Sequence, residues 1–289
     1  MERPPGGPPY RTVPVRLKPE EAFSLGDDGT GAGVGLGLDP GVRACLFDLD
    51  GVLTQTAKIH AEAWKKTFDT FLHAYDKRTG RADRPFDQYS DYENYVDGKT
   101  REDGTRSFLA SREIVLPEGG PDDEPGTETV YGIGQAKQWA FMSLLEQHGP
   151  QVYDGSVRYV HAARAAGLLC AVVTSSANCA AILQAAGISD LFDATVDGHD
   201  VAAQHLHGKP APDSYLAGAK ALGATAAQAA VFEDALSGVE AGRAGGFVTV
   251  VGVDRVGEDH AERLKEHGAT VVVKDLSDLI SEPEGGVEQ

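Results

Sequence analysis

Residues 44–54 read ACLFDLDGVLT, an apolar run that ends in two aspartates and a glycine. The run predicts a short buried β-strand, and strand geometry puts Asp48 and Asp50, two positions apart, on the same side of the chain. Open α/β sheets bind ligands at the carboxyl ends of their strands. Two close carboxylates need a cation or a shared proton. The stretch therefore indicates a metal site with one reactive carboxylate, and a solvated acidic strand end is the alternative.

Apolar runs that end in polar residues recur from about residue 150. The run 168–173 ends at Thr174, and the run 230–232 ends at Glu233 and Asp234. Between them, Lys209 stands beside two prolines, which present its side chain stiffly. The alternation with helical segments predicts a parallel sheet. The turn after Thr174 can offer backbone donors at a helix start, although a plain capping turn would look the same; it consists of Ser175, Ser176, Ala177 and Asn178.

Composition limits the partners. The chain has 289 residues, a formal net charge of -18 and a pI near 4.8, so we expect no binding to nucleic acid or to an anionic membrane. Its three cysteines have no framework spacing, which fits a reducing cytoplasm. The chain has no run of membrane-spanning length and no apolar secretion segment. We expect a soluble, cytoplasmic, monomeric protein that holds any anionic ligand through a metal ion and a few placed cations.

The four segments that contain Asp48, Thr174, Lys209 and Asp234 resemble the motifs of the haloacid dehalogenase superfamily of phosphotransferases. The first, second, third and fourth motifs of that superfamily occur in this order. The resemblance implies an α/β fold, with a three-layer Rossmann-like core, a parallel sheet and a helical cap domain inserted after the first strand. It implies four catalytic residues: Asp48 as nucleophile, Asp50 as general acid and base, Thr174 as a hydrogen-bond donor to the phosphoryl group, and Lys209 as a neutralising cation. The cofactor it implies is Mg²⁺, with the metal site formed by Asp48, the Asp50 backbone carbonyl, Glu233 and Asp234.

Within this superfamily, residues 48–64 resemble the β-phosphoglucomutases. The helix predicted from residue 56 carries His60 and Trp64 four positions apart, so they share one face. Taken alone, such a pair more often packs in a core. The matching residues of the family lie at the hinge and in the sugar pocket. The resemblance therefore implies that both residues contact the substrate.

A second match to the same family lies in an insert rich in aromatic and charged residues. Residues 96–103 read VDGKTRED and resemble the family's Gly-Val-Ser-Arg-Glu-Asp segment. The match implies that Arg101 binds the phosphate remote from the chemistry, because guanidinium pairs bidentately with phosphate; a charged helix start is the alternative. Gln138 and Trp139 replace the family's Asn and Asp beside Lys137. The substrate-binding residues expected here are Gly98, Lys99, Arg101 and Lys137, with Ser175, Ser176, Ala177 and Asn178 from the core.

The domain organisation follows from these segments. Residues 1–40 are rich in Gly and Pro, which predicts a disordered tail with a short element near 20–23. We expect a core domain at 41–56 and 150–281, a helical cap at 57–149 that includes an exposed loop near 116–126, and a second disordered tail at 282–289.

The acceptor of the phosphoryl group separates the candidate functions. A mutase passes it to a sugar hydroxyl and needs a cap that excludes water and a second phosphate site. The cap matches favour a β-phosphoglucomutase-type enzyme that acts on a small-molecule sugar phosphate through an aspartyl phosphate and a glucose 1,6-bisphosphate. The alternatives are a sugar-phosphate phosphatase of the same superfamily and a non-catalytic phosphosugar-binding protein.

Overall fold

A computed structural model describes residues 35–281 of the chain. Its centre is a six-stranded sheet in the order β3-β2-β1-β4-β5-β6, in which every pair of neighbours is parallel. The strands are β1 (Ala44–Phe47), β2 (Leu169–Val173), β3 (Ala194–Val196), β4 (Ala229–Glu233), β5 (Thr249–Val253) and β6 (Val271–Val273). The first strand of residues 35–281 therefore lies in the middle of the sheet, which places Asp48, directly after it, between the ends of β2 and β4.

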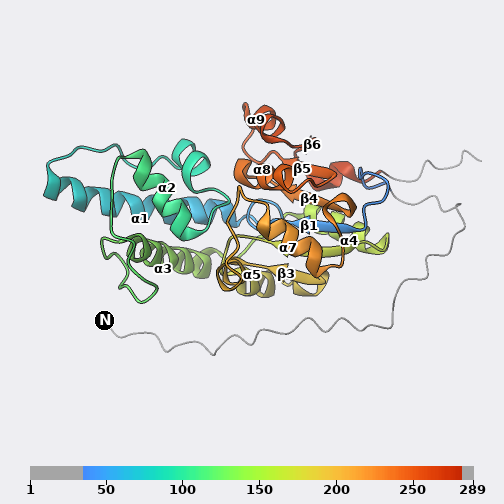
Figure 1. Ribbon diagram of the computed structural model, residues 1–289, viewed down its shortest axis with the longest axis horizontal. Coiled ribbons are helices and arrows are strands. Elements are labelled where there is room, and N and C mark those ends of the chain that lie inside the picture. Colours follow the sequence, from blue (N-terminus) through green and yellow to red (C-terminus); the bar gives the residue numbers. More distant parts are fainter. Residues whose placement is uncertain (1–34, 282–289) are drawn as a thin grey trace, which may run out of the picture. The chain divides into compact units, whose positions relative to one another are not determined.

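Helices cover both faces of this sheet (Figure 1). Because side chains alternate along a strand, Phe47 of β1 packs into the core on one face and Leu46 into the core on the other. The first face is covered by α4 (Asp154–Ala165), α5 (Cys179–Ala186) and the turn η4 (Leu276–Leu279). The second is covered by α7 (Asp213–Ala221), α8 (Leu236–Ala244) and α9 (His260–His267). The predicted three-layer α/β core is confirmed.

Short elements complete the connections between strands. They are η2 (Ser189–Leu191), α6 (Gly198–Ala203) and η3 (Ala226–Gln228). Within residues 35–281, no helix combines the length and the apolar composition that a bilayer crossing requires.

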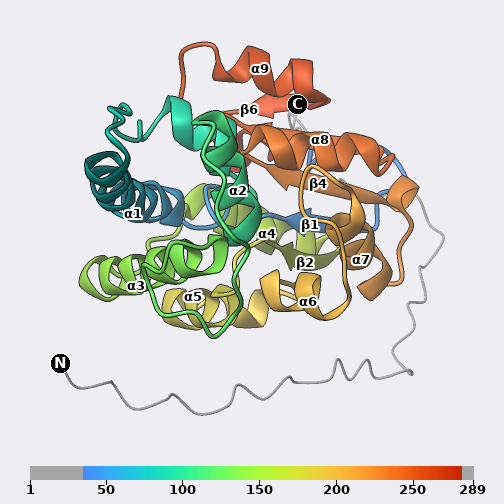
Figure 2. The same ribbon diagram turned by 60° about the vertical axis from the view of Figure 1, so that its left-hand side comes forward.

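The helical insert follows β1, as the resemblance implied. It comprises α1 (Thr56–Thr79), the π-helical turn η1 (Tyr92–Val96), α2 (Arg101–Ser111) and α3 (Val130–His148), which Figure 2 shows grouped together beside the sheet. Its interior is aromatic: the Phe68 ring stacks on Trp64 with centroids 4.8 Å apart and lies 4.0 Å from the Phe108 ring. The insert therefore has an apolar core of its own.

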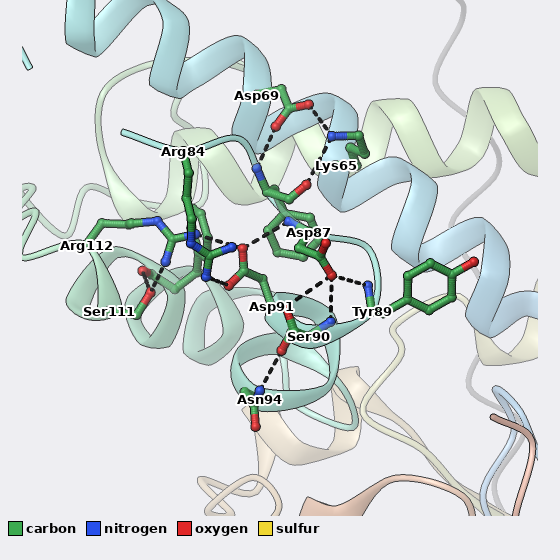
Figure 3. Close-up of polar contacts among 12 residues, drawn as sticks. Lys65, Asp69, Arg84, Asp87, Tyr89, Ser90, Asp91, Asn94, Ser111 and Arg112 are labelled. Carbon is green, nitrogen blue, oxygen red and sulfur yellow. Dashed lines mark hydrogen bonds and ion pairs between the residues drawn. The ribbon is translucent and has the colours of Figure 1, made fainter. Parts of the chain in front are cut away.

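A buried carboxylate ties the insert together (Figure 3). The Asp91 side chain is 1% exposed and forms ion pairs with Arg84 and Arg112, each 2.7 Å long. The backbone N–H of Asp87 donates a further hydrogen bond of 2.9 Å to Asp91. Two cations and one N–H offset the cost of burying this charge.

Gly35 and Leu36, which the sequence prediction placed in a disordered tail, are bound to the folded part of the chain. The tail was expected to reach residue 40, but Gly35 and Ser281 exchange two backbone hydrogen bonds of 3.1 and 3.0 Å, and Leu36 is buried. The Tyr159 hydroxyl donates to the Leu36 carbonyl at 2.8 Å. A Gly-rich segment has no local pattern, so only these distant partners order it. The predictions for residues 1–34, including the element near 20–23, and for 282–289 lie outside the described residues.

Candidate active site

Parallel pairing brings the polar strand ends together. Phe47 is in register with Phe232 of β4 and with Val172 of β2, so Asp48, Glu233 and the residues after Val173 emerge at one edge of the sheet. The backbone N–H of Asp48 still donates to the Phe232 carbonyl at 2.9 Å. The position of Asp48 is therefore set by the sheet itself.

Lys209 lies between two of these carboxylates. Its Nζ is 2.6 Å from Asp48 Oδ1 and 2.7 Å from Glu233 Oε1, and the residue is 2% exposed. Burial alone would lower the pKa of Lys209, but the two carboxylates raise it well above its ordinary value. Lys209 is therefore a permanent cation beside Asp48, as its predicted neutralising role requires.

Glu233 differs from the sequence prediction, which grouped it with the metal ligands. It is fully buried; Oε1 accepts from Lys209, and Oε2 accepts from the backbone N–H of Ala235 at 2.7 Å. Both oxygens are thus bound inside the protein, and Glu233 is absent from the residues that line the active-site cavity. Its geometry is that of a residue that holds Lys209 in place.

Asp50 lies in a different environment from Asp48. Its Oδ1 accepts a hydrogen bond from Thr56 and is 3.3 Å from His60 Nε2, while its Oδ2 is 3.5 Å from the Thr174 hydroxyl. Burial acts to raise the pKa of Asp50, but His60 and Thr56 together hold it below its ordinary value. Two carboxylates in unlike environments are the arrangement expected for separate chemical roles.

Asp234 is a buried carboxylate near the end of β4. It is 8% exposed, and no Lys, Arg or His nitrogen of residues 35–281 lies within 4.0 Å of its oxygens. Burial and the neighbouring carboxylates of Asp97, Glu233 and Asp48 raise the pKa of Asp234 well above its ordinary value. A cation bound beside the Asp234 carboxylate would offset the cost of burying its charge.

The turn after Asp50 passes directly against Asp234. Gly51 has φ +92°, and a Cβ at this position would lie 1.8 Å from Asp234 Oδ2. Only glycine fits both the backbone angle and the space.

The oxygen donors at this edge fit Mg²⁺. Across residues 35–281, no set of three or more His, Cys, Asp or Glu side chains is arranged to hold a metal by itself. Mg²⁺ commonly takes one or two protein carboxylates and completes its coordination with water and phosphate. Asp48, Asp234 and the Asp50 carbonyl form a donor set of that kind.

The residues predicted on α1 and α3 meet beside Asp50. Lys137 is 2% exposed, and its Nζ lies 2.5 Å from His60 Nδ1 and 5.2 Å from the centre of the Trp64 ring. Burial lowers the pKa of Lys137 to about 7. Burial and the adjacent Lys137 likewise lower the pKa of His60. His60 Nε2 is buried without a well-formed hydrogen bond, although it faces Asp50.

The predicted phosphate-binding segment lies at the start of α2. Arg101 is the first residue of that helix and lines the same cavity as Asp48. Lys99 also lines the cavity, and its Nζ donates to Ser107 at 2.9 Å. The Gly98 carbonyl accepts from the Ser175 hydroxyl at 2.7 Å, so this segment is bound directly to the core.

The turn after Thr174 meets α3. Ser176 N–H donates to the Thr174 hydroxyl at 3.1 Å, and Asn178 N–H donates to the Ser176 hydroxyl at 3.2 Å. Gln138 and Asn178 exchange two side-chain hydrogen bonds of 2.7 and 3.1 Å. The sequence comparison noted Gln138 only because it replaces the family's Asn. In the structure it forms a second link between the insert and the core.

A single cavity collects the predicted residues. Its walls include every predicted catalytic and substrate-binding residue except Lys209, which lies behind Asp48. Sequence reasoning missed some wall residues. The informative one is Asp97, which directly precedes Gly98 and could have been found from that position. The other residues missed are Tyr92, Val96, Gln138 and Ala235.

Comparisons with known proteins agree with this geometry. A family model described as haloacid dehalogenase-like hydrolase matches residues 42–246. A β-phosphoglucomutase of Mycobacterium bovis is 54% identical over 246 residues, which cover 85% of this chain and 94% of that protein. A phosphorylated carbohydrates phosphatase of Thermotoga maritima is 26% identical, covering 81% and 94%. The crystal structure of a hydrolase from Pseudomonas syringae has a TM-score of 0.64 at 26% identity, covering 82% and 95%.

These matches confirm the resemblance drawn from the four motifs. Strand register and buried charge independently bring the same residues to one edge of the sheet. The chain is an enzyme and belongs to the haloacid dehalogenase-like hydrolase family.

Proposed function

We propose that the enzyme is a Mg²⁺-dependent β-phosphoglucomutase that interconverts β-D-glucose 1-phosphate and glucose 6-phosphate. The observation that carries this proposal is the cavity itself. One of its walls holds the Asp48 nucleophile, and Arg101 and Lys99 of the insert form another. A substrate with two phosphates needs cations at both ends, whereas a simple phosphatase needs them at one.

The chemistry divides between the two aspartates. Asp48 attacks phosphorus and forms an aspartyl phosphate while the bond to the sugar oxygen breaks. Asp50 takes a proton from the sugar hydroxyl that attacks the aspartyl phosphate, and the carboxyl group so formed gives this proton to the sugar oxygen that leaves when Asp48 is phosphorylated again. His60 and Thr56 hold Asp50 in place for both transfers. Asp48, Asp234 and the Asp50 carbonyl would hold Mg²⁺, which would supply positive charge to offset the charge of phosphate and nucleophile.

The insert has a second role in this proposal, as the cap domain at 57–149 over a core domain at 41–56 and 150–281. Hydrogen bonds from Ser175 to Gly98 and between Gln138 and Asn178 join the two around the cavity. Closure of the cap excludes water from the aspartyl phosphate. The bisphosphate intermediate reverses its orientation before the cap releases it. We propose a cytoplasmic monomer.

A second candidate is a sugar-phosphate phosphatase. The Thermotoga maritima relative carries a phosphatase name and also aligns over most of its length. The four core motifs serve either reaction, so the cap contacts favour the mutase.

The deciding experiment supplies the purified full chain with Mg²⁺, β-glucose 1-phosphate and a trace of β-glucose 1,6-bisphosphate. Glucose 6-phosphate and free phosphate are followed together. Glucose 6-phosphate without phosphate release is the expected result. Rapid phosphate release from several sugar phosphates would instead identify a phosphatase, and ligand binding without turnover would identify a non-catalytic binding protein.

A further inference from the structure

Asp97 brings an additional carboxylate into the active site from the insert. It follows η1, where its N–H donates to the Tyr92 carbonyl at 3.0 Å; this i to i+5 bond is typical of π-helical turns, which are frequent at functional sites. Its side chain lines the cavity together with Asp48, Asp50 and Asp234. The residue therefore adds negative charge where the core already has an excess.

The backbone around Asp97 is held firmly against the core. The Ser237 hydroxyl donates to the Asp97 carbonyl at 2.9 Å, and the Ser175 hydroxyl donates to the next carbonyl, that of Gly98, at 2.7 Å. A Cβ at Gly98, whose φ is +69°, would lie 2.4 Å from Ser237 Oγ. These contacts fix Asp97 through its backbone; its carboxylate interacts with the Tyr92 side chain but has no basic partner within 4.0 Å among residues 35–281.

The described residues provide no cation for that carboxylate. No Lys, Arg or His nitrogen of residues 35–281 lies within 4.0 Å of it. Lys209 is bound to Asp48 and Glu233, Lys137 contacts His60, and Lys99 donates to Ser107. Burial and the neighbouring Glu233 raise the pKa of Asp97 to about 7, and Asp97 is the neighbour that most raises the pKa of Asp234.

The carboxylates of Asp97 and Asp234 are both negative. When cap closure brings them together, they repel each other unless a cation lies between them. Resting on the proposed Mg²⁺ site, we propose that Asp97 is a positioning residue that couples cap closure to the metal, by binding the divalent cation from the cap side through a water. The cation then stabilises the closed cap, and the closed cap raises the affinity for the cation by the same factor. Metal-free protein favours the open cap.

The test uses the full chain and Mg²⁺ alone, with no sugar phosphate. Hydrogen exchange of the backbone at residues 96–99 and the thermal unfolding temperature are followed across a Mg²⁺ titration. In the parent, Mg²⁺ protects this segment and raises the unfolding temperature. In Asp97→Asn, the Mg²⁺ concentration for half-maximal protection rises about tenfold, the usual cost of removing a supporting carboxylate from a metal site. Without metal, the unfolding temperature of Asp97→Asn does not fall below that of the parent, because the substitution removes the repulsion between Asp97 and the neighbouring carboxylates.

Glu93→Gln is the matched control, since Glu93 is a carboxylate of η1 that pairs with Arg263 of α9 rather than lining the cavity. It keeps the Mg²⁺ response of the parent. Asp97→Ser provides a second variant with the same expected loss.

An unchanged Mg²⁺ midpoint in both Asp97 variants, with binding lost in Asp234→Asn, overturns this inference and leaves the proposed metal site intact. Unchanged Mg²⁺ binding in Asp234→Asn as well overturns the metal site and this inference together. A lower metal-free unfolding temperature in Asp97→Asn would make the role merely structural and also overturn the inference.

Discussion

The core and the insert each contain a cluster of three charges around a buried central group, with opposite composition. At the edge of the sheet, one cation, Lys209, lies between the carboxylates of Asp48 and Glu233. In the insert, one carboxylate, Asp91, lies between Arg84 and Arg112 (Figure 3). The first cluster has an excess of negative charge, to which Asp50 and Asp234 add, whereas the second also receives a backbone N–H.

The difference separates a reactive site from a structural one. Both oxygens of Asp91 accept hydrogen bonds from other residues, and Asp91 does not line the cavity that Asp48 faces. Asp48 faces a cavity, and nearby Asp234 has no charged partner among residues 35–281. A buried charge that is paired within the protein has a structural role, whereas an unpaired buried charge favours the binding of a ligand of opposite charge.

The largest expected effect comes from Asp48→Asn, which keeps the shape of the side chain and removes the nucleophile. Phosphoryl transfer should fall by at least about 1,000-fold, or roughly 4 kcal/mol, because no aspartyl phosphate can form. Steady-state assay and mass detection of the phosphorylated chain measure it. Circular dichroism checks that the variant folds, and near-parental activity in a folded variant would refute the assignment of the core cluster.

Asp91→Ala should have the next largest effect, on stability rather than chemistry. It leaves the nearly buried Arg112 without its partner, and breaking a buried pair in this way costs about 3–5 kcal/mol. Urea unfolding measures the change. Arg84→Ala is the control, because its side chain is 59% exposed and such pairs contribute about 1 kcal/mol or less. Equal losses in the two variants would contradict the structural reading of this cluster.

Arg101→Ala tests whether the cap serves a remote phosphate. Isomerisation of β-glucose 1-phosphate should fall about 10- to 100-fold, the value of one charge-assisted contact. Hydrolysis of acetyl phosphate, which has no second end to bind, should remain close to the parental rate. Parallel kinetics with both substrates give the answer, and an equal loss with both would argue against a remote-phosphate role.

Thr100→Ala should have the smallest effect. Thr100 caps α2, accepting from the Asp103 N–H at 3.3 Å and donating to the Asp103 carboxylate at 2.8 Å. Its loss should destabilise the protein by about 1 kcal/mol. Thr100→Ser keeps the hydroxyl and should match the parent in thermal unfolding. A serine variant as unstable as the alanine variant would show that packing of the methyl group, rather than capping, matters.

The strand-end residues were predictable because a short motif and a strand period are local. Asp48 and Asp50 share a strand end, and the register that pairs Phe47 with Phe232 brings Asp48 beside Glu233. The same argument could not distinguish Glu233 from Asp234. One of two neighbouring acids turns inward to Lys209 and the other faces the cavity, and only packing decides which.

Residues of the insert were harder to predict. Asp97 carries no motif, and its place in the cavity depends on hydrogen bonds from Ser175 and Ser237, each far from it in sequence. Gln138 is similar, since its partner Asn178 is 40 residues away. Such contacts form only when the insert docks on the core.

The sequence by itself determined the family, the parallel α/β core, the inserted helices and the residues proposed for phosphoryl transfer, because strand periodicity and motif spacing are properties of short segments. Tertiary structure alone decided which buried charges are satisfied: Glu233 by Lys209, Asp91 by two arginines, and Asp97 and Asp234 by no basic side chain of residues 35–281. The physical reason is that the cost of a buried charge depends on what lies within a few ångströms, and those neighbours come from distant parts of the chain.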